Sequence, residues 1–163
     1  MTTTATALPT FKSVRDTLAD LLFRDVTLLP SDPVPIGPRH PVAIGVYVDD
    51  ALRMTAVAVA DLPLAAYAGA SIGLVPKGGA QAAIEDGVLP PAIEENFSEV
   101  LNVLAGLLNV SGGRHLRLHA TYAPNQLPPG DVMALVRKLG RRVDVALTVA
   151  GYGTGHLSIV LDD

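Results

Sequence analysis

The sequence predicts an α+β fold, in which helices pack on an antiparallel or mixed β-sheet. Two observations carry this prediction. Apolar residues alternate in paired runs at 42–60 and 142–161, as they do in β-hairpins, and segments with helical spacing of apolar residues separate these runs. Hairpins separated by helices are typical of α+β domains. The chain has 163 residues, 49% of them hydrophobic, which is enough to form a buried core without disulfides or bound metal ions.

The N-terminal part of the chain is expected to stand apart from the main domain. Apolar residues at helical spacing predict a helix at 11–23. The stretch 29–41 contains five prolines, which lack an amide donor and fix φ, so it is predicted to be an extended linker. We therefore expect an N-terminal tail, helix and Pro-rich linker at 1–41 and an α+β domain at 42–163. The first helix packs either on this domain or on a neighbour.

Within the main domain, periodicity and turn residues define each element. Two helices, starting near Pro63 and Pro91, are the main ones expected to pack on the sheet, since proline suits the first helical turn. Asp131 is expected to cap a third, short helix. The predicted order is strands at 42–48 and 53–60, a helix at 63–74, irregular structure at 77–90, a long helix at 91–109, a strand at 115–122, a loop at 124–130, a helix at 132–139, and strands at 142–150 and 156–161 joined by a glycine-rich turn.

Composition excludes several classes of function. The chain has no cysteine, so it forms no disulfide or thiolate metal site, and it fits a cytoplasmic location. The net charge is −4 and the basic residues are scattered, which argues against nucleic acid as a partner. The apolar stretch 54–76 contains Asp61 and Pro63 and is rich in alanine, so we expect no membrane insertion. His40 and His156 are isolated, and no cluster has metal-ligand spacing.

The long helix at 91–109 separates apolar from polar residues. At 100° per residue, its apolar residues form one face, which is expected to be the core face. The opposite face carries polar residues and glycine at spacings of 4, 3, 4 and 3, so they form one continuous stripe. The stripe consists of Glu95, Glu99, Asn102, Gly106 and Asn109.

Glu99 and Asn102 are neighbours on this stripe, and their side chains suit a specific chemistry. A carboxylate can bind a cation or a partner's lysine, and a carboxamide can donate and accept, so it can hold a water molecule in one orientation. Holding water in line with a phosphoryl group is a large part of what a phosphoryl hydrolase does. Gly106 leaves room for another surface to approach. The alternative is the ordinary polar side of an amphipathic helix.

The segment 99–106, Glu-Val-Leu-Asn-Val-Leu-Ala-Gly, resembles the Glu-x-x-Asn-x-x-x-Gly helix of the CheC/CheX chemotaxis phosphatases. A hairpin and a helix of small residues precede it, and a short loop, a strand and Pro124 follow it, as in that family. The resemblance covers 42–161. The earlier helix at 64–74 contains no Glu or Asn, so the chain is similar to the single-motif CheX type. Glu95 stands where the family often has Asp or Ser.

The resemblance implies a hydrolase of two-component signalling that removes the aspartyl phosphate of a CheY-type response regulator. It implies that Asn102 orients the attacking water and that Glu99 pairs with a partner lysine. Glu95, Gly106 and Asn109 would then complete the partner-binding surface. The chain would need no cofactor of its own, because the Mg2+ belongs to the partner regulator.

Two other functions stay open. Flagellar-switch relatives of this fold can lack the phosphatase residues, so the chain is alternatively a non-catalytic adapter in a signalling or flagellar-type complex. The third, weaker hypothesis is a domain of this fold whose pocket binds a small molecule. An uncovered sheet edge tends to pair, so we also expect a homodimer.

Overall fold

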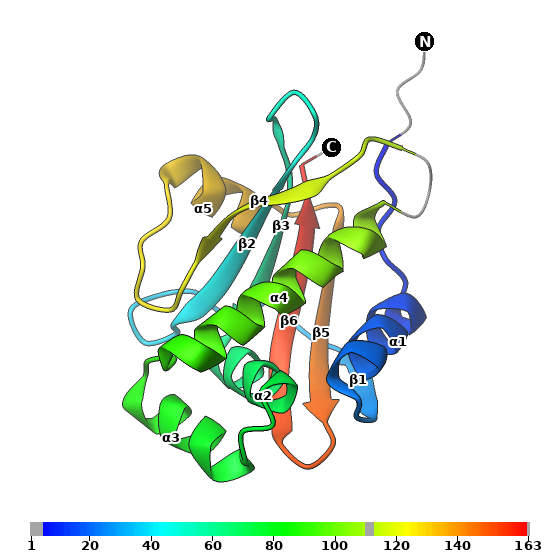
Figure 1. Cartoon of the computed structure of the whole chain (residues 1–163). Coiled ribbons are helices and arrows are strands. Elements are labelled where there is room, and N and C mark those ends of the chain that lie inside the picture. The colour runs from blue at the N-terminus through cyan, green and yellow to red at the C-terminus, as the bar shows by residue number, and fades with distance from the viewer. Residues whose placement is uncertain (1–4, 110–112, 163) are drawn as a thin grey trace.

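The computed structural model describes residues 5–109 and 113–162, so the first residues of the expected tail lie outside it. Its centre is a six-stranded sheet in the order β1-β5-β6-β3-β2-β4, and every neighbouring pair is antiparallel (Figure 1). The predicted α+β class is therefore confirmed, with a purely antiparallel sheet. The strands are β1 (Val26–Pro30), β2 (Val42–Val48), β3 (Met54–Asp61), β4 (Arg117–Tyr122), β5 (Arg142–Val149) and β6 (Gly153–Leu161).

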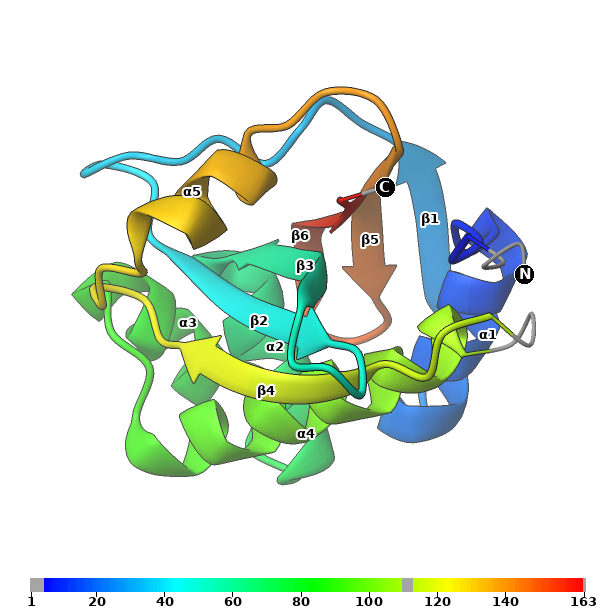
Figure 2. The ribbon, with the colours of Figure 1, turned by 90° about the horizontal axis from the view of Figure 1, so that it is seen from above.

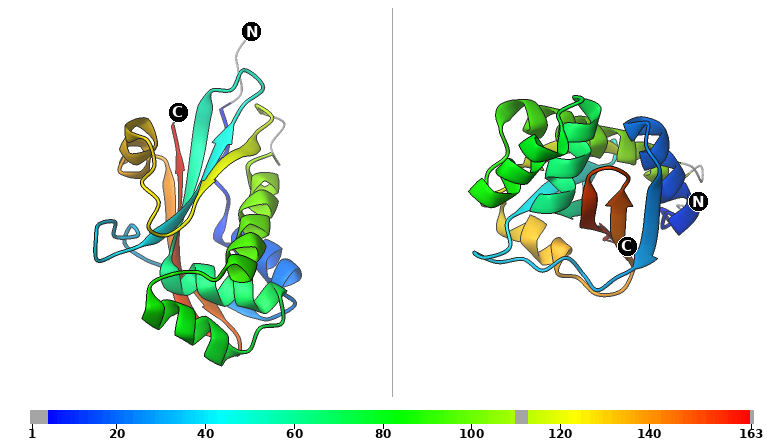
Figure 3. Two further views of the ribbon diagram at one scale, coloured as in Figure 1. Left: turned by 60° about the vertical axis from the view of Figure 1, so that its left-hand side comes forward. Right: turned by 90° about the horizontal axis from the view of Figure 1, so that it is seen from below.

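Helices cover both faces of the sheet. Helices α1 to α4 lie on one face, which we call the front, and α5 lies on the back together with the segment 31–41 (Figure 2; Figure 3, left). Among the described helices, none is long and apolar enough to cross a membrane. The helices are α1 (Phe11–Leu22), α2 (Leu62–Ile72), α3 (Lys77–Asp86), α4 (Pro91–Leu108) and α5 (Gly130–Val136).

The two faces of the sheet differ in side-chain size. Because alternate residues of a strand point to opposite faces, β2 and β3 present small residues and one tyrosine, Tyr47, to the front and branched aliphatic residues to the back. The front residues include Ala43, Ala56, Ala58 and Ala60, and the back residues include Ile44, Val46, Val57 and Val59. The small front face lets α2, which is itself rich in alanine and almost wholly buried, pack closely against the sheet.

The N-terminal segment contributes to the sheet and to the front layer. Helix α1 is capped by Thr10, whose hydroxyl accepts a hydrogen bond from the amide of Ser13 at 3.1 Å, and it packs against α4. Strand β1, which was not predicted from the sequence, pairs with β5 at one edge of the sheet. Pro30 ends this strand within the expected linker, because proline is tolerated on an edge strand.

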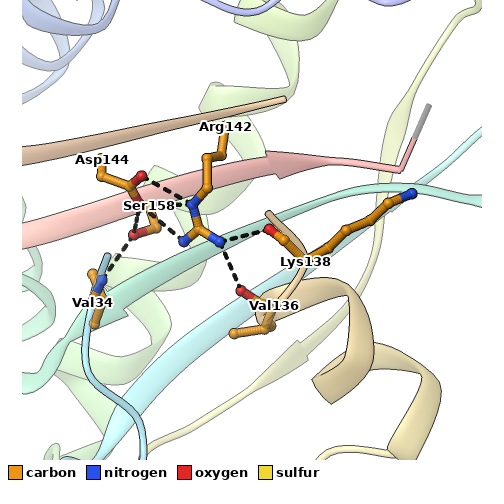
Figure 4. A network of polar contacts seen from close by, with 6 residues as sticks. All are labelled: Val34, Val136, Lys138, Arg142, Asp144 and Ser158. Carbon is orange, nitrogen blue, oxygen red and sulfur yellow. Dashed lines mark hydrogen bonds and ion pairs between the residues drawn. The ribbon is translucent and has the colours of Figure 1, made fainter. Parts of the chain in front are cut away.

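A buried polar network holds the segment 31–41 against the back of the sheet (Figure 4). The amide of Val34 donates to Ser158 Oγ at 3.1 Å, and that hydroxyl donates to Asp144 Oδ1 at 2.6 Å. Arg142 pairs with Asp144 at 2.9 Å and also donates to the carbonyl of Val136 at the end of α5. The network therefore joins the linker, β5, β6 and α5.

Three local predictions were wrong. The stretch 77–90 was expected to be irregular, but it contains α3, in which Ala80 and Ala83 are buried. Helix α5 begins at Gly130 with Pro129 as its N-cap, so Asp131 lies in its first turn and does not cap it. Strand β6 begins at Gly153, inside the expected glycine-rich turn. In each case the chain forms regular structure where glycine had indicated a loop.

Candidate functional site

Strand β2 fixes the part of α4 that carries Asn102. The hydroxyl of Tyr47 donates to the carbonyl of Leu101 at 2.6 Å, and both residues are buried. Burial raises the pKa of Tyr47, so the hydroxyl keeps its proton and stays a donor. A Cβ on Gly45 would lie 3.2 Å from Leu101 Cδ2, so the glycine lets the helix approach the strand closely. The carbonyl next to Asn102 is thus anchored to the sheet.

Helix α2 fixes the N-terminal half of α4. A Cβ on Gly69 would lie only 2.5 Å from the carbonyl oxygen of Ile93, so the two helices touch through their backbones. Asn96 Nδ2 donates to the carbonyl of Gly69 at 3.1 Å. With the contact to β2, this leaves α4 little freedom to rotate or slide. The stripe opposite its core face is therefore held in a fixed orientation.

The stripe is open to solvent along most of its length. The structure leaves Glu95, Glu99, Asn102 and Gly106 exposed on α4, and α1 packs beside the helix without covering them (Figure 1). Within 5–109 and 113–162, the side chains of Glu99 and Asn102 make no hydrogen bond or ion pair. The carboxylate and the carboxamide are therefore available to an external partner.

Two members of the stripe have environments that their spacing does not reveal. Asn109 is half-buried, and its side chain accepts from the amide of Leu116 and donates to the carbonyl of Leu116, both at 2.8 Å. It therefore ties the end of α4 to the residues before β4. A Cβ on Gly106 would meet no atom within 4 Å, so packing inside the protein does not require glycine there.

His156 was treated as isolated, but the structure pairs it with Asp61. The ring Nδ1 lies 2.8 Å from Asp61 Oδ2, while Oδ1 accepts from the amides of Leu64 and His156. Asp61 therefore caps α2 and binds β6 at once. The pair lines a hollow of about 810 Å³ below the linker, together with Arg39 and His40. In the described part of the chain, no group of three His, Cys, Asp or Glu residues could hold a metal ion.

Comparison with known proteins finds solved structures with a similar fold. No family model and no curated protein matches the sequence. A chain of the CheX–CheY–BeF3–Mg2+ complex from Borrelia burgdorferi is similar over 92% of this chain and 93% of that chain, with a TM-score of 0.55 and 11% identity. CheX from Desulfovibrio desulfuricans is similar over 93% and 95%, with a TM-score of 0.51 and 8% identity.

The same fold occurs in the middle domain of FliM. The FliM middle domain from Vibrio alginolyticus is similar over 90% of this chain and 85% of that chain, with a TM-score of 0.56 and 12% identity. This protein therefore has the fold of the CheC/CheX family, which the FliM middle domain shares. At these identities the likeness concerns the fold, and the function is argued from the residues of α4.

Proposed function

We propose that this protein hydrolyses the aspartyl phosphate of a CheY-type response regulator in chemotaxis signalling, with Asn102 orienting the water and Glu99 anchoring the partner. The observation that carries the proposal is the pairing of these two exposed side chains on a helix that β2 and α2 hold in place. The likeness to a chain of a CheX–CheY complex supports the choice of partner.

Asn102 can position water without taking part in covalent chemistry. Its carboxamide oxygen accepts a hydrogen bond from the water, and its nitrogen donates to a phosphoryl oxygen. The water oxygen attacks phosphorus in line as the bond to the regulator's aspartate breaks, which releases a free carboxylate and inorganic phosphate. A rigid helix lowers the barrier because the orientation is set before the reaction.

Glu99 and the remaining stripe residues would hold the partner. The carboxylate of Glu99 pairs with a lysine of the regulator, and Glu95 extends the negative charge along the same side of α4. Gly106 admits the partner backbone, because no side chain stands between the two surfaces. Asn109 marks the C-terminal limit of this surface. The Mg2+ expected in the complex belongs to the regulator, and we propose no cofactor for this chain.

The test is phosphate release from phosphorylated CheY-type regulators of the same organism. Asn102→Ala should lower the stimulated rate about a hundredfold, as the loss of a positioned hydrogen-bonding group in an active site does. Glu99→Gln should raise KM about tenfold, because it removes a charge that pairs with the partner. Glu94→Gln is the matched control, since Glu94 is exposed on α4 away from the stripe. Full activity in Asn102→Ala would contradict the proposal.

A second candidate is a non-catalytic adapter, and the fold shared with the FliM middle domain favours it. An adapter would bind a regulator or motor protein and would leave the rate of phosphate release unchanged. A stable complex without faster release, and with no effect of Asn102→Ala on either, would decide for this candidate.

We also propose that the protein acts in the cytoplasm as a homodimer. Strand β4 is an edge strand that pairs only with β2 among the described strands, so its outer backbone groups can pair with a second copy. Light scattering on the purified protein should give twice the monomer mass. A monomer at all accessible concentrations would exclude the dimer without affecting the proposed chemistry.

A further inference from the structure

The stripe on α4 is too polar and too short to hold a partner by itself. Its exposed members, Glu95, Glu99, Asn102 and Gly106, include no apolar side chain. The helix rises about 16 Å from Glu95 to Gly106. A specific interface buries about 800 Å² on each partner and gains most of its energy from a few side chains that become fully desolvated. The docking surface must therefore extend beyond the stripe.

Two large apolar side chains stand exposed in the same helical layer. Phe23 is 93% exposed and Leu74 is 83% exposed. They follow the C-terminal ends of α1 and α2, which both pack against α4 on the front face (Figure 1). Leu127 and Leu139 are similarly exposed, but they flank α5, which covers the back of the sheet.

The backbone at both residues is unfavourable for a side chain. Phe23 has φ 53° and Leu74 has φ 55°, in the left-handed region where helices usually end on glycine. After α2, the amide of Val75 donates to the carbonyl of Ala70 at 2.8 Å, which is the pattern of a Schellman cap with leucine at its left-handed position. Neither side chain contributes to the buried core, and each holds its backbone in an unfavourable conformation. Both side chains are therefore free to contact a partner.

Internal contacts hold these two helix ends together. The hydroxyl of Ser71 in α2 donates to the carbonyl of Leu22 in α1 at 3.3 Å. The turn between β5 and β6 supports both ends, because Tyr152 donates to the carbonyl of Val75 at 2.5 Å and its ring lies 4.8 Å from the guanidinium of Arg24. Phe23 and Leu74 are thus presented by a preorganised surface.

This surface is continuous with the catalytic stripe. Asn96 lies one helical turn before Glu99, and its Nδ2 occupies the space where a Cβ on Gly73 would be, at 2.5 Å. Gly73 directly precedes Leu74, so the end of α2 abuts α4 beside the stripe. On the α1 side, Leu22 and Val100, the residue after Glu99, line the same small cavity in the core.

We infer that Phe23 and Leu74 are the apolar anchors of a docking surface, and that they bind the same regulator that Glu99 and Asn102 contact. The inference rests on the proposed function. The occupant is a CheY-type domain, and the inference requires it to present an apolar patch beside its phosphorylation site. Its lysine meets Glu99, and the apolar patch covers the ends of α1 and α2. The polar stripe then supplies chemistry and orientation, and the anchors supply affinity.

The test is the affinity of the full chain for the beryllofluoride-treated regulator. The double variant Phe23→Gly with Leu74→Gly should raise Kd at least tenfold, and in turnover KM should rise by a larger factor than kcat falls. Glycine relieves the left-handed backbone, so the melting temperature should stay unchanged or rise. A structural role would instead lower the melting temperature.

Leu52→Gly is the matched control. Leu52 is 59% exposed with φ 61°, but it lies in the turn between β2 and β3, at the end of the sheet opposite the β5–β6 turn (Figure 1). It should change stability in the same direction as the double variant and leave Kd unaltered. An unchanged Kd in the double variant would overturn the inference, while a loss of turnover in Asn102→Ala would still support the phosphatase. If the unaltered protein neither binds nor dephosphorylates any regulator, both the proposed function and the inference fail.

Discussion

At the scale of single residues, spacing along α4 predicted the stripe but did not predict the environment of each member. Glu99 and Asn102 are exposed, as the periodicity indicated. Asn109 has the same spacing, yet its side-chain amide is bonded to the backbone of Leu116. That contact involves a residue outside the helix, so the helical periodicity could not predict it. The assignment of roles to Glu99 and Asn102 stays a prediction from chemistry and resemblance.

Gly106 offers a prediction in which stability and function change in opposite directions. Gly106→Ala should raise the free energy of unfolding by about 0.5–1 kcal/mol, because alanine is the better helix former and its Cβ meets no other atom. The same methyl group should weaken binding to the regulator. Urea unfolding and a binding titration measure the two effects.

Gly69→Ala is the control for this change, because its Cβ would lie 2.5 Å from the carbonyl of Ile93. It should lower the free energy of unfolding by about 1–3 kcal/mol through overpacking. If Gly106→Ala proved as destabilising as Gly69→Ala, then α4 would not be open at Gly106.

At the scale of elements, a clear repeat of apolar residues was enough to predict a helix or strand. Segments without such a repeat were missed. The hairpin of β2 and β3 and the long helix α4 were predicted because their apolar residues repeat clearly. Helix α3 was missed because Gly78 and Gly79 stand in its first turn, where glycine usually indicates a loop. Strand β1 was missed because it is short, lies at an edge and ends at a proline. Tertiary packing decides such elements.

The contact between β2 and α4 gives a pH-dependent prediction. Burial raises the pKa of Tyr47 above its usual 10.0, so the unfolded chain loses this proton at lower pH than the folded protein does. The stability due to Tyr47 is complete below pH 10 and is lost as the pH rises toward the folded pKa. Tyr47→Phe should cost about 1 kcal/mol at neutral pH through the lost hydrogen bond to Leu101.

Unfolding of both proteins at pH 7 and above pH 10 measures this effect. The difference in stability between the natural protein and Tyr47→Phe should shrink as the pH rises. A difference that stays constant would mean that Tyr47 is accessible to water.

At the scale of the whole molecule, the two faces of the sheet are covered by different elements. Helices α1 to α4, including the exposed stripe on α4, cover the front. Helix α5, the segment 31–41 and a buried polar network cover the back. The side chains of Arg142 and Asp144 are only 10% and 12% exposed, so each depends on the other for charge compensation. The sequence indicated a linker at 29–41 but did not reveal this attachment, because it requires partners from β5 and β6.

Arg142→Met should therefore destabilise the protein by about 3 kcal/mol, since it leaves Asp144 buried without its partner. The segment 31–41 should become more susceptible to limited proteolysis. In Arg142→Met with Asp144→Leu, which removes both charges, much of the stability should return. Equal destabilisation in the single and double variants would show that packing, and not charge, holds the segment.

The position of β1 has a consequence for biosynthesis. Val26 pairs with Val149, so β1 finds its sheet partner only after the whole of the intervening chain has been translated. Until β5 has left the ribosome, this edge of the sheet stays incomplete and the N-terminal segment has apolar residues without their final cover. A chaperone that shields the segment from α1 to β1 during synthesis should therefore raise the yield of folded protein.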